Sequence, residues 1–308
     1  MGLLDGRVAI VTGGGRGIGR AHCVELAAQG AIVVVNDLGG VATGPGDPAV
    51  GASPADDVVA EIRAAGGQAW ADATSVSDHD GIGRLVAHTV EAHGRLDVVV
   101  NNAGVLRDGT FANMTEDNWD FVLDVHLKGT FNLMKHAINH WRERSKAGET
   151  VHGRVINTTS GTGLFGNIGQ ANYGAAKAAI ANLTMITAME FERYGVTVNA
   201  ISPIARTRMT ENLPFMRATA ADDDGWDRFD AANSAPVVAW LASESSGWLT
   251  GAVLRIDGAT VLRVQPWSVD ESTAYTARSG RHFEAAELDG GLRSAYRLLP
   301  TGIATVRR

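Results

Sequence analysis

The chain has 308 residues, of which 45% are hydrophobic and 20% are charged, an ordinary balance for a globular protein. Its formal net charge is −7 and it has no long basic run, which argues against nucleic acid as the main partner. No run of about 18 apolar residues is present, so the sequence predicts no membrane span. The single cysteine, Cys23, is expected in the core and suits a reducing compartment, so we expect a cytoplasmic protein.

The first forty residues predict a strand, a glycine-rich turn, a helix, a second strand and an acidic residue. The strand over 7–12 (RVAIVT) is short, apolar and β-branched, as in a buried parallel sheet. A glycine-rich turn over 13–19 follows, then a helix over 20–30 and a strand over 31–36 that ends at Asp37. This order is typical of a dinucleotide-binding unit.

The glycine spacing is TGxxxGxG, with Thr12, Gly13, Gly17 and Gly19 in the motif positions. Glycines there let backbone amides approach a pyrophosphate at a helix N-terminus, where the helix dipole favours negative charge. The alternative is a plain strand-to-helix turn without a ligand.

The acidic residue after the second strand bears on the choice of cofactor. Asp37 is placed where a carboxylate can accept hydrogen bonds from both adenosine ribose hydroxyls and would repel a 2′-phosphate. Arg16, inside the glycine-rich turn, favours the opposite choice, because a cation there can hold a 2′-phosphate. Unrelieved repulsion excludes a ligand, whereas an exposed arginine can turn to solvent, so the sequence predicts NAD rather than NADP.

The alternation of strands and helices continues after an irregular loop over 38–54. Helices are predicted over 55–65, 78–93, 119–141, 172–194 and 235–242, and strands over 68–73, 96–100, 154–159, 196–201 and 252–256. This order predicts an α/β fold with one Rossmann-type, doubly wound parallel sheet and helices on both faces. We expect one domain over 1–262 and a C-terminal extension over 263–308 that has no clear periodicity.

Polar and small residues gather where the predicted strands end. Ser75 and Val76, with Asp72, are expected to border an adenine, and Asn101 or Asn102 can tie strand ends together. Ala103 and Gly104 let a cofactor approach in the crevice where open α/β sheets bind ligands. The histidines of the helix over 78–93 lack an acidic cluster beside them, so no metal site is expected.

A serine, a tyrosine and a lysine predict acid–base chemistry at a carbonyl or alcohol oxygen. Tyr173 and Lys177 are four positions apart and share a face if this segment is helical. We expect the lysine cation to favour the phenolate and so lower the pKa of the phenol. Ser160, at the end of a predicted strand, can supply a second hydrogen bond to the same oxygen.

Taken together, TGGGRGIG at 12–19, NNAG at 101–104, Ser160 and YGAAK at 173–177 resemble the short-chain dehydrogenases/reductases, over roughly residues 5–260. The resemblance implies that Tyr173 is the acid/base and that Lys177 lowers its pKa and binds the nicotinamide ribose. The cofactor-binding residues expected are Gly13, Arg16, Gly17, Ile18, Gly19, Asp37, Ser75, Val76, Asn102, Ala103, Gly104, Tyr173, Lys177, Pro203, Ile204 and Thr207.

One position departs from the family pattern. The family carries an asparagine where VHLKGTF places His126. As a fourth catalytic residue, an imidazole there can bridge the water that the asparagine helps to hold, or can titrate near neutrality and change the pH profile. The alternative is a packed helix histidine without a catalytic role.

VVVNDLGG at 33–40, VHLKGTF at 125–131 and GNIGQANY at 166–173 are similar to one branch of the family. That branch is the (3R)-hydroxyacyl-CoA dehydrogenase unit of peroxisomal multifunctional enzyme type 2 and its free-standing bacterial relatives. It implies oxidation of a (3R)-3-hydroxyacyl-CoA with NAD by a homodimer or homotetramer.

Three alternatives stay open at this point. The substrate can be a steroid or another secondary alcohol, the reaction can be reduction of a 3-oxoacyl thioester, or the protein can be a regulatory cofactor-binding protein without catalysis. Residues 202–234 are expected to form a substrate loop. The extension is expected near the active site or a subunit interface, with a disordered tail as the alternative.

Overall fold

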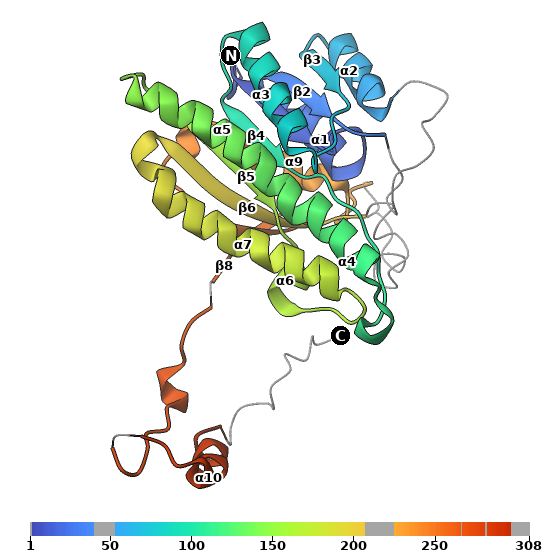
Figure 1. Ribbon diagram of the computed structural model, residues 1–308. Helices are drawn as coiled ribbons and strands as arrows, with labels where there is room; N and C mark the ends of the chain where they lie inside the picture. The colour runs from blue at the N-terminus through green and yellow to red at the C-terminus, as the bar shows by residue number, and fades with distance from the viewer. Residues whose placement is uncertain (1, 40–52, 207–224, 266, 281, 297–308) are drawn as a thin grey trace. The chain divides into compact units, whose positions relative to one another are not determined.

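The computed structural model describes residues 2–39, 53–206, 225–265, 267–280 and 282–296 (Figure 1). By its contacts the chain divides into two compact units, Met1–Val264 and Gln265–Arg308. Within the described part of the chain, none of the helices combines the length and apolarity needed to cross a bilayer.

The first unit is built on an eight-stranded sheet in the order β3-β2-β1-β4-β5-β6-β7-β8. Its strands are β1 (Val8–Thr12), β2 (Ile32–Asn36), β3 (Gln68–Asp72), β4 (Val98–Asn101), β5 (Gly153–Thr158), β6 (Val196–Ile204), β7 (Val253–Asp257) and β8 (Thr260–Val264). The pairings from β3 through β7 are all parallel. The predicted doubly wound sheet is confirmed.

The prediction of an entirely parallel sheet is wrong at one edge, where β8 pairs antiparallel to β7. The hairpin turn contains Gly258, whose φ of 56° favours glycine. Val261 and Leu262 on β8 are 48% and 51% exposed. A strand exposed on both faces lacks the alternation of apolar and polar residues by which strands are predicted, so the sequence did not indicate it.

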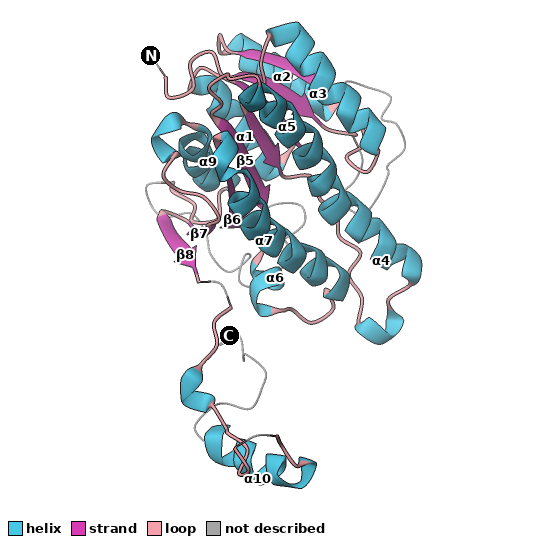
Figure 2. Ribbon diagram, turned by 60° about the vertical axis from the view of Figure 1, so that its left-hand side comes forward, coloured by secondary structure: helices cyan, strands magenta, loops and turns pink. Residues whose placement is uncertain are grey.

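Helices cover both faces of the sheet (Figure 2). They are α1 (Gly17–Ala28), α2 (Pro54–Ala64), α3 (His79–His93), α4 (Glu116–Leu123), α5 (Gly129–Lys146), α6 (Gly161–Phe165), α7 (Ala171–Phe191) and α9 (Ala235–Ala242). Successive strand residues point to opposite faces: Ala9 and Val11 of β1 pack with α1, α2 and α9, whereas Ile10 packs with α3 and α5. Cys23 of α1 is buried, as predicted.

The single long helix predicted over 119–141 is interrupted. Between α4 and α5 the backbone forms a π-helical segment, Asp124–Lys128, which contains His126. Short π-helical segments insert one residue into a helix and are frequent at functional sites. No residue type marks such a segment strongly, so the helical spacing of the sequence did not reveal it.

The second unit contains a helix that the sequence did not predict, α10 (Ala285–Tyr296). Within this unit the rings of Tyr275 and Phe283 stack with their centroids 6.0 Å apart. Gly291 of α10 lies against the Tyr275 ring, where a side chain would collide.

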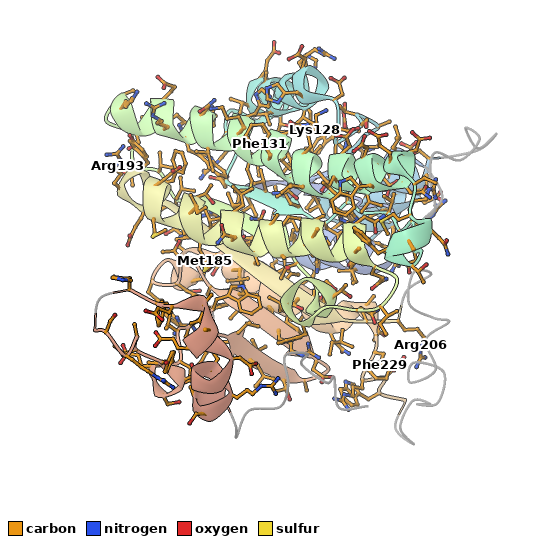
Figure 3. The ribbon with its side chains drawn as sticks, turned by 60° about the horizontal axis from the view of Figure 1, so that its bottom comes forward. Lys128, Phe131, Met185, Arg193, Arg206 and Phe229 are labelled. Carbon is orange, nitrogen blue, oxygen red and sulfur yellow. The ribbon has the colours of Figure 1, made fainter. Side chains whose placement is uncertain are left out.

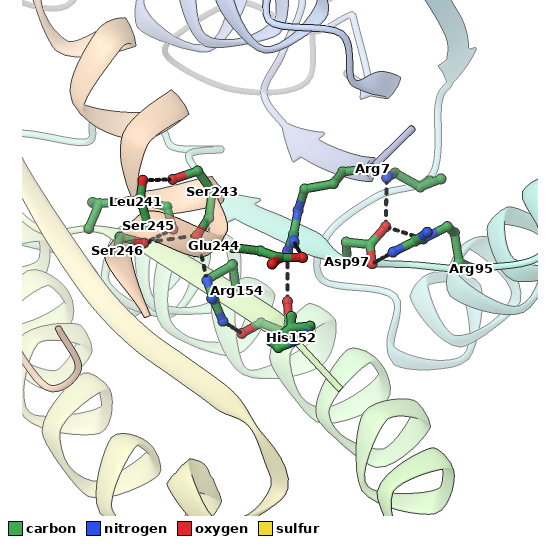
Figure 4. A network of polar contacts seen from close by, with 12 residues as sticks. Arg7, Arg95, Asp97, His152, Arg154, Leu241, Ser243, Glu244, Ser245 and Ser246 are labelled. Atoms are coloured by element: carbon green, nitrogen blue, oxygen red, sulfur yellow. Dashed lines mark hydrogen bonds and ion pairs between the residues drawn. The ribbon is translucent and has the colours of Figure 1, made fainter. Parts of the chain in front are cut away.

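A charged network joins the amino-terminal ends of the strands (Figure 4). The buried Asp97 carboxylate accepts hydrogen bonds from the Val8 amide (2.9 Å) and from two nitrogens of Arg95 (2.7 and 2.8 Å). Arg7 is 5% exposed and donates to the His152 carbonyl at 2.7 Å. Burial lowers the pKa of its guanidinium, and the nearby Asp97 charge opposes this shift. The Asp97 carboxylate therefore compensates cationic charge at the edge of the sheet away from the site described below.

Asp97→Asn tests this network. Removing one partner of a buried ionic network leaves uncompensated charge, so we expect the free energy of unfolding to fall by about 3 kcal/mol. Chemical denaturation measures the change. The control is Glu244→Gln: Glu244 is 68% exposed and lies 3.7 Å from Arg7, so its loss should cost less than about 1 kcal/mol. Equal effects of the two variants would contradict the argument.

Candidate active site

The predicted site residues meet at the carboxyl edge of the sheet. The glycine-rich turn follows β1, the NNAG segment begins with the last residue of β4, and Ser160 follows β5. These strands are neighbours in the sheet and run parallel, so the segments that leave them lie side by side. This is the edge at which open α/β sheets bind their ligands.

The glycine-rich turn is shaped by the absence of side chains. Gly13 and Gly17 have φ angles of 62° and 52°, which L residues with a side chain rarely adopt. A Cβ atom on Gly13 would lie 2.8 Å from the Ala103 Cα atom, and one on Gly19 would collide with the Gly13 carbonyl oxygen. Helix α1 begins at Gly17, so its free amides open onto this turn. This backbone cradle fits the pyrophosphate of a dinucleotide.

Asp37 lies directly after β2, beside the same turn. Its two carboxylate oxygens accept hydrogen bonds from the amides of Gly15 and Gly39, each at 2.9 Å. The side chain is partly exposed, and each oxygen can accept further bonds. The carboxylate is thus oriented by backbone and still able to receive ribose hydroxyls. Arg16 is exposed at the N-terminus of α1.

The two asparagines of the NNAG segment tie strand ends together. The Asn102 side chain donates to the carbonyls of Thr12 (3.0 Å) and Gly13 (3.1 Å). The Thr12 hydroxyl accepts in return from the amides of Asn102 and Ala103. Asn101 donates to Asn157 on β5 at 2.9 Å. Asn102 therefore acts on the cofactor cradle through the turn that it holds.

The remaining predicted cofactor residues lie at other strand ends. Ser75 follows β3 and shares a hydrogen bond with Ser77 (2.9 Å). Val76 is 9% exposed and its carbonyl accepts from Asn132 at 2.8 Å. Pro203 and Ile204 lie within β6, which runs three residues beyond the predicted strand. Thr207 lies outside the described residues.

Ser160, Tyr173 and Lys177 converge. The Lys177 side chain is buried, and its Nζ atom donates to the Thr158 carbonyl at 2.7 Å and lies 5.6 Å from the centre of the Tyr173 ring. Ser160 lies near enough to the Tyr173 phenol to lower its pKa. Its hydroxyl also accepts from the Thr162 amide at 3.2 Å, which caps α6.

The pKa directions differ from the expectation for this pair. Burial raises the pKa of Tyr173, the nearby Asp108 charge raises it further, and the Ser160 hydrogen bond opposes both. Burial lowers the pKa of Lys177 to about 7. Desolvation of the charged form is the largest cause of both shifts. A bound ligand that supplies charge or polar groups would change this balance.

His126 is packed against Tyr173. The rings meet edge to face with centroids 5.1 Å apart, and His126 is 2% exposed. A Cβ on Gly104 would collide with the imidazole, so this glycine provides space for it. The Nε2 atom lies 2.8 Å from the Val105 carbonyl oxygen and 3.1 Å from the Val105 amide nitrogen.

The suggestion that His126 titrates near neutrality is wrong. Burial, and then the Lys177 charge, hold the pKa of His126 well below its usual value of 6.5. The imidazole is therefore neutral at neutral pH. With a proton on Nε2 it can donate to the Val105 carbonyl, and without one it can accept from the Val105 amide, so each tautomer satisfies one of the two contacts.

Three residues of this region were not singled out from the sequence as functional. Asn172 is buried, donates to the carbonyls of Arg107 and Asn118, each at 3.1 Å, and accepts from the Tyr173 amide at 2.8 Å. Asp108 and Gln170 are hydrogen-bonded to each other at 3.0 Å. The segment GQANY contains two of the three and was the one available signal.

The comparison with protein-family models decides the family. The model described as short chain dehydrogenase matches residues 7–217, which include the glycine-rich turn, the NNAG segment and the three converging side chains. The chain belongs to the short-chain dehydrogenase/reductase family. It is therefore an oxidoreductase acting on a CH–OH group, and this family uses nicotinamide cofactors.

Similar short-chain dehydrogenases/reductases include both free-standing proteins and larger ones. The crystal structure of one from Mycobacterium avium has a TM-score of 0.85 at 46% identity, covering 98% of this chain and 99% of that one. The hydroxyacyl-CoA dehydrogenase ChsB1 of Mycobacterium tuberculosis is 39% identical over 95% of this chain and 89% of its own length. Peroxisomal multifunctional enzyme type 2 of Mus musculus is 42% identical over 78% of this chain, which covers 30% of that protein. The resemblance to this branch is confirmed.

The lowered pKa of Lys177 predicts a pH dependence of stability. The folded-state pKa is about 7 and the ordinary value is 10.5, so between these values the unfolded chain binds more protons. The free energy of unfolding should therefore rise with pH above pH 7 relative to Lys177→Met, with a slope approaching about 1.4 kcal/mol per pH unit. Denaturation of both proteins without cofactor between pH 6 and pH 9 measures the difference. Parallel pH curves would contradict the burial argument.

Proposed function

We propose that the protein oxidises a (3R)-3-hydroxyacyl-CoA to the 3-ketoacyl-CoA with NAD. The observation that carries the proposal is the convergence of Ser160, Tyr173 and Lys177 beside the glycine-lined cradle. The substrate class is supported by relatives named as hydroxyacyl-CoA dehydrogenase and peroxisomal multifunctional enzyme. A cytoplasmic location, argued from the single cysteine of the chain, stays a prediction.

The residues of the cradle supply binding and selectivity. The amides at the start of α1 would hold the pyrophosphate, and Asp37 would accept hydrogen bonds from the adenosine ribose hydroxyls. Because Asp37 carries negative charge and lies beside the Gly15 amide, a 2′-phosphate would meet repulsion there. We therefore propose NAD as the cofactor; when bound, it accepts a hydride from the alcohol carbon.

Tyr173 and Ser160 would handle the proton. The substrate hydroxyl would lie between them, Ser160 would donate a hydrogen bond to its oxygen, and Tyr173 as phenolate would remove its proton. The C–H bond breaks as the hydride leaves, and the C–O bond becomes the ketone. Lys177, within 5.6 Å of the Tyr173 ring, would favour the phenolate when it is protonated.

His126 is proposed as a positioning residue. Neutral and buried, it anchors the segment after β4 through Val105 and supports one side of the Tyr173 ring. Because its pKa is held well below 6.5, the imidazole carries no charge at neutral pH. In this role His126 holds Tyr173 in place without contacting the substrate, which differs both from a fourth catalytic residue and from a histidine that only packs.

A homodimer or homotetramer is proposed from one exposed surface. Helices α5 and α7 run side by side, with Phe131 on α5, Lys128 at the end of the π-helical segment before it, and Met185 on α7 (Figure 3). Phe131 is 45% exposed and Met189 75% exposed. A groove of about 380 Å³ beside Phe131 has mostly apolar walls. Exposed apolar residues of this kind are typical of subunit contacts.

Turnover of a substrate series tests the proposed reaction. We expect NAD reduction with (3R)-3-hydroxyacyl-CoAs and little with their (3S) isomers or with free secondary alcohols. Tyr173→Phe should lower kcat/KM by at least about 100-fold, because it removes the proton acceptor. Tyr194→Phe, at the far end of α7 in the turn Glu192–Tyr194, is the matched control and should retain full activity. Turnover of free alcohols but of no acyl-CoA would refute the substrate class.

Asp37→Ser tests the cofactor choice. Removing the carboxylate deletes two charge-assisted hydrogen bonds to the ribose and the repulsion of a 2′-phosphate. The ratio of kcat/KM for NAD to that for NADP should therefore fall by roughly 10-fold or more. Asp57→Ser, an exposed aspartate of α2, should leave the ratio unchanged. A wild-type protein that uses NADP as well as NAD would show the argument to be wrong.

A further inference from the structure

Gln170 joins three segments around the catalytic pair through its side-chain amide. The Oε1 atom accepts hydrogen bonds from the Thr162 hydroxyl and from the Asn167 side chain, both at 2.9 Å. The Nε2 atom donates to the Asp108 carboxylate at 3.0 Å. One amide therefore connects α6, the loop before α7 and the loop after β4.

The backbone around Gln170 strengthens the same connection. The Gly109 amide donates to the Gly169 carbonyl at 2.8 Å, and Gly109 and Gln170 form an isolated parallel bridge. The Gln170 carbonyl accepts from the Gly174 amide at 2.7 Å, inside the first turn of α7. Gln170 thus lies where the loop after β4 meets the helix that carries Tyr173.

The connection to Ser160 runs through Thr162. The Thr162 amide donates to the Ser160 hydroxyl at 3.2 Å, while the Thr162 hydroxyl donates to Gln170. Helix α6 has five residues and none of them is buried. Helices this short are not stable by themselves. Leu164 packs against a cluster that includes Ala181, and a Cβ at Gly163 would collide with the α7 backbone at Ala178, so α6 lies directly on α7. The hydrogen bonds of Thr162 add to this packing and hold the Ser160 end of α6.

We infer that Gln170 is a positioning residue that holds Ser160 in alignment with Tyr173, in addition to the bonds that join Lys177 to the end of β5. Its amide is matched to its neighbours, because two donors point to Oε1 and one acceptor receives Nε2–H. Neither a carboxylate nor an apolar side chain of the same length can make all three bonds. The inference rests on the proposed function where it is tested by kcat. A second test, the titration of Tyr173, depends only on the geometry of Ser160 and Tyr173.

Gln170→Met is the main test. The side chain keeps its length and loses all three hydrogen bonds, so Ser160 and Tyr173 should lose their alignment. We expect kcat to fall about 10- to 100-fold, with the KM for NAD within two-fold of wild type. Gln68→Met, an exposed glutamine at the start of β3, is the matched control and should leave kcat unchanged. A kcat for Gln170→Met within two-fold of wild type would overturn the inference.

Thr162→Val keeps the test decisive if Gln170→Met fails to fold. It removes one hydroxyl, retains the volume of the side chain, and breaks the link between Gln170 and the Ser160 segment. A fall in kcat in the same direction supports the inference, and wild-type kcat refutes it.

A titration of Tyr173 needs no substrate and separates this inference from the proposed reaction. The groups that face its phenol are Ser160, Asp108, His126 and Lys177. Ultraviolet difference titration, with Tyr173→Phe as the blank, reports the pKa of the phenol in each background.

In this titration Asp108→Asn keeps a hydrogen-bond acceptor for Gln170 and removes the charge, so the pKa of Tyr173 should fall. Adding Gln170→Met to Asp108→Asn should raise it again, because the Ser160 hydrogen bond that lowers it is lost. No difference between the single and double variants would overturn the inference even if the protein oxidises an unrelated alcohol. A wild-type protein inactive on every alcohol, with the two pKa changes as expected, would refute the proposed reaction alone.

Discussion

The site depends on one buried ammonium group. Lys177 is 3% exposed and donates to the Thr158 carbonyl, while the Thr159 hydroxyl donates to the Lys177 carbonyl at 2.7 Å. These two bonds join α7 to the end of β5. Ser160 is the next residue after Thr159, and Tyr173 lies one helical turn before Lys177, so the same contact places both groups at one point.

The amino-terminal edge of the sheet stabilises the fold, and the carboxyl edge carries the residues of the candidate active site. At the amino-terminal edge Asp97 compensates cationic charge and joins Val8 to Arg95. At the carboxyl edge the glycine-rich turn leaves a cradle lined by backbone, held by Asn102. A Cβ atom at Gly13 would meet the Ala103 backbone, and one at Gly19 would meet the Gly13 carbonyl oxygen, so the glycines let the turn pack closely on itself and on the NNAG segment.

Short-range patterns predicted most of the fold and the central residues of the site. The order of strand, glycine-rich turn, helix and Asp37 was visible because each element is made of neighbours in sequence. The i, i+4 spacing of Tyr173 and Lys177 was visible for the same reason. The antiparallel β8 and the π-helical segment around His126 were missed because each lacks a distinct local pattern. Helix α10 was missed because Gly290 and Gly291 lie inside it and oppose a helix.

The sequence by itself determined which groups are present: a glycine-rich turn, a carboxylate after β2, and a serine, tyrosine and lysine in a family arrangement. The tertiary structure decided how those groups behave. Burial sets the pKa of Lys177 to about 7 and keeps His126 neutral, and burial depends on segments distant in the chain. The bond of Gln170 to Asp108 spans 62 residues. Desolvation and long-range hydrogen bonds arise when separate elements meet, and for that reason no local pattern encodes them.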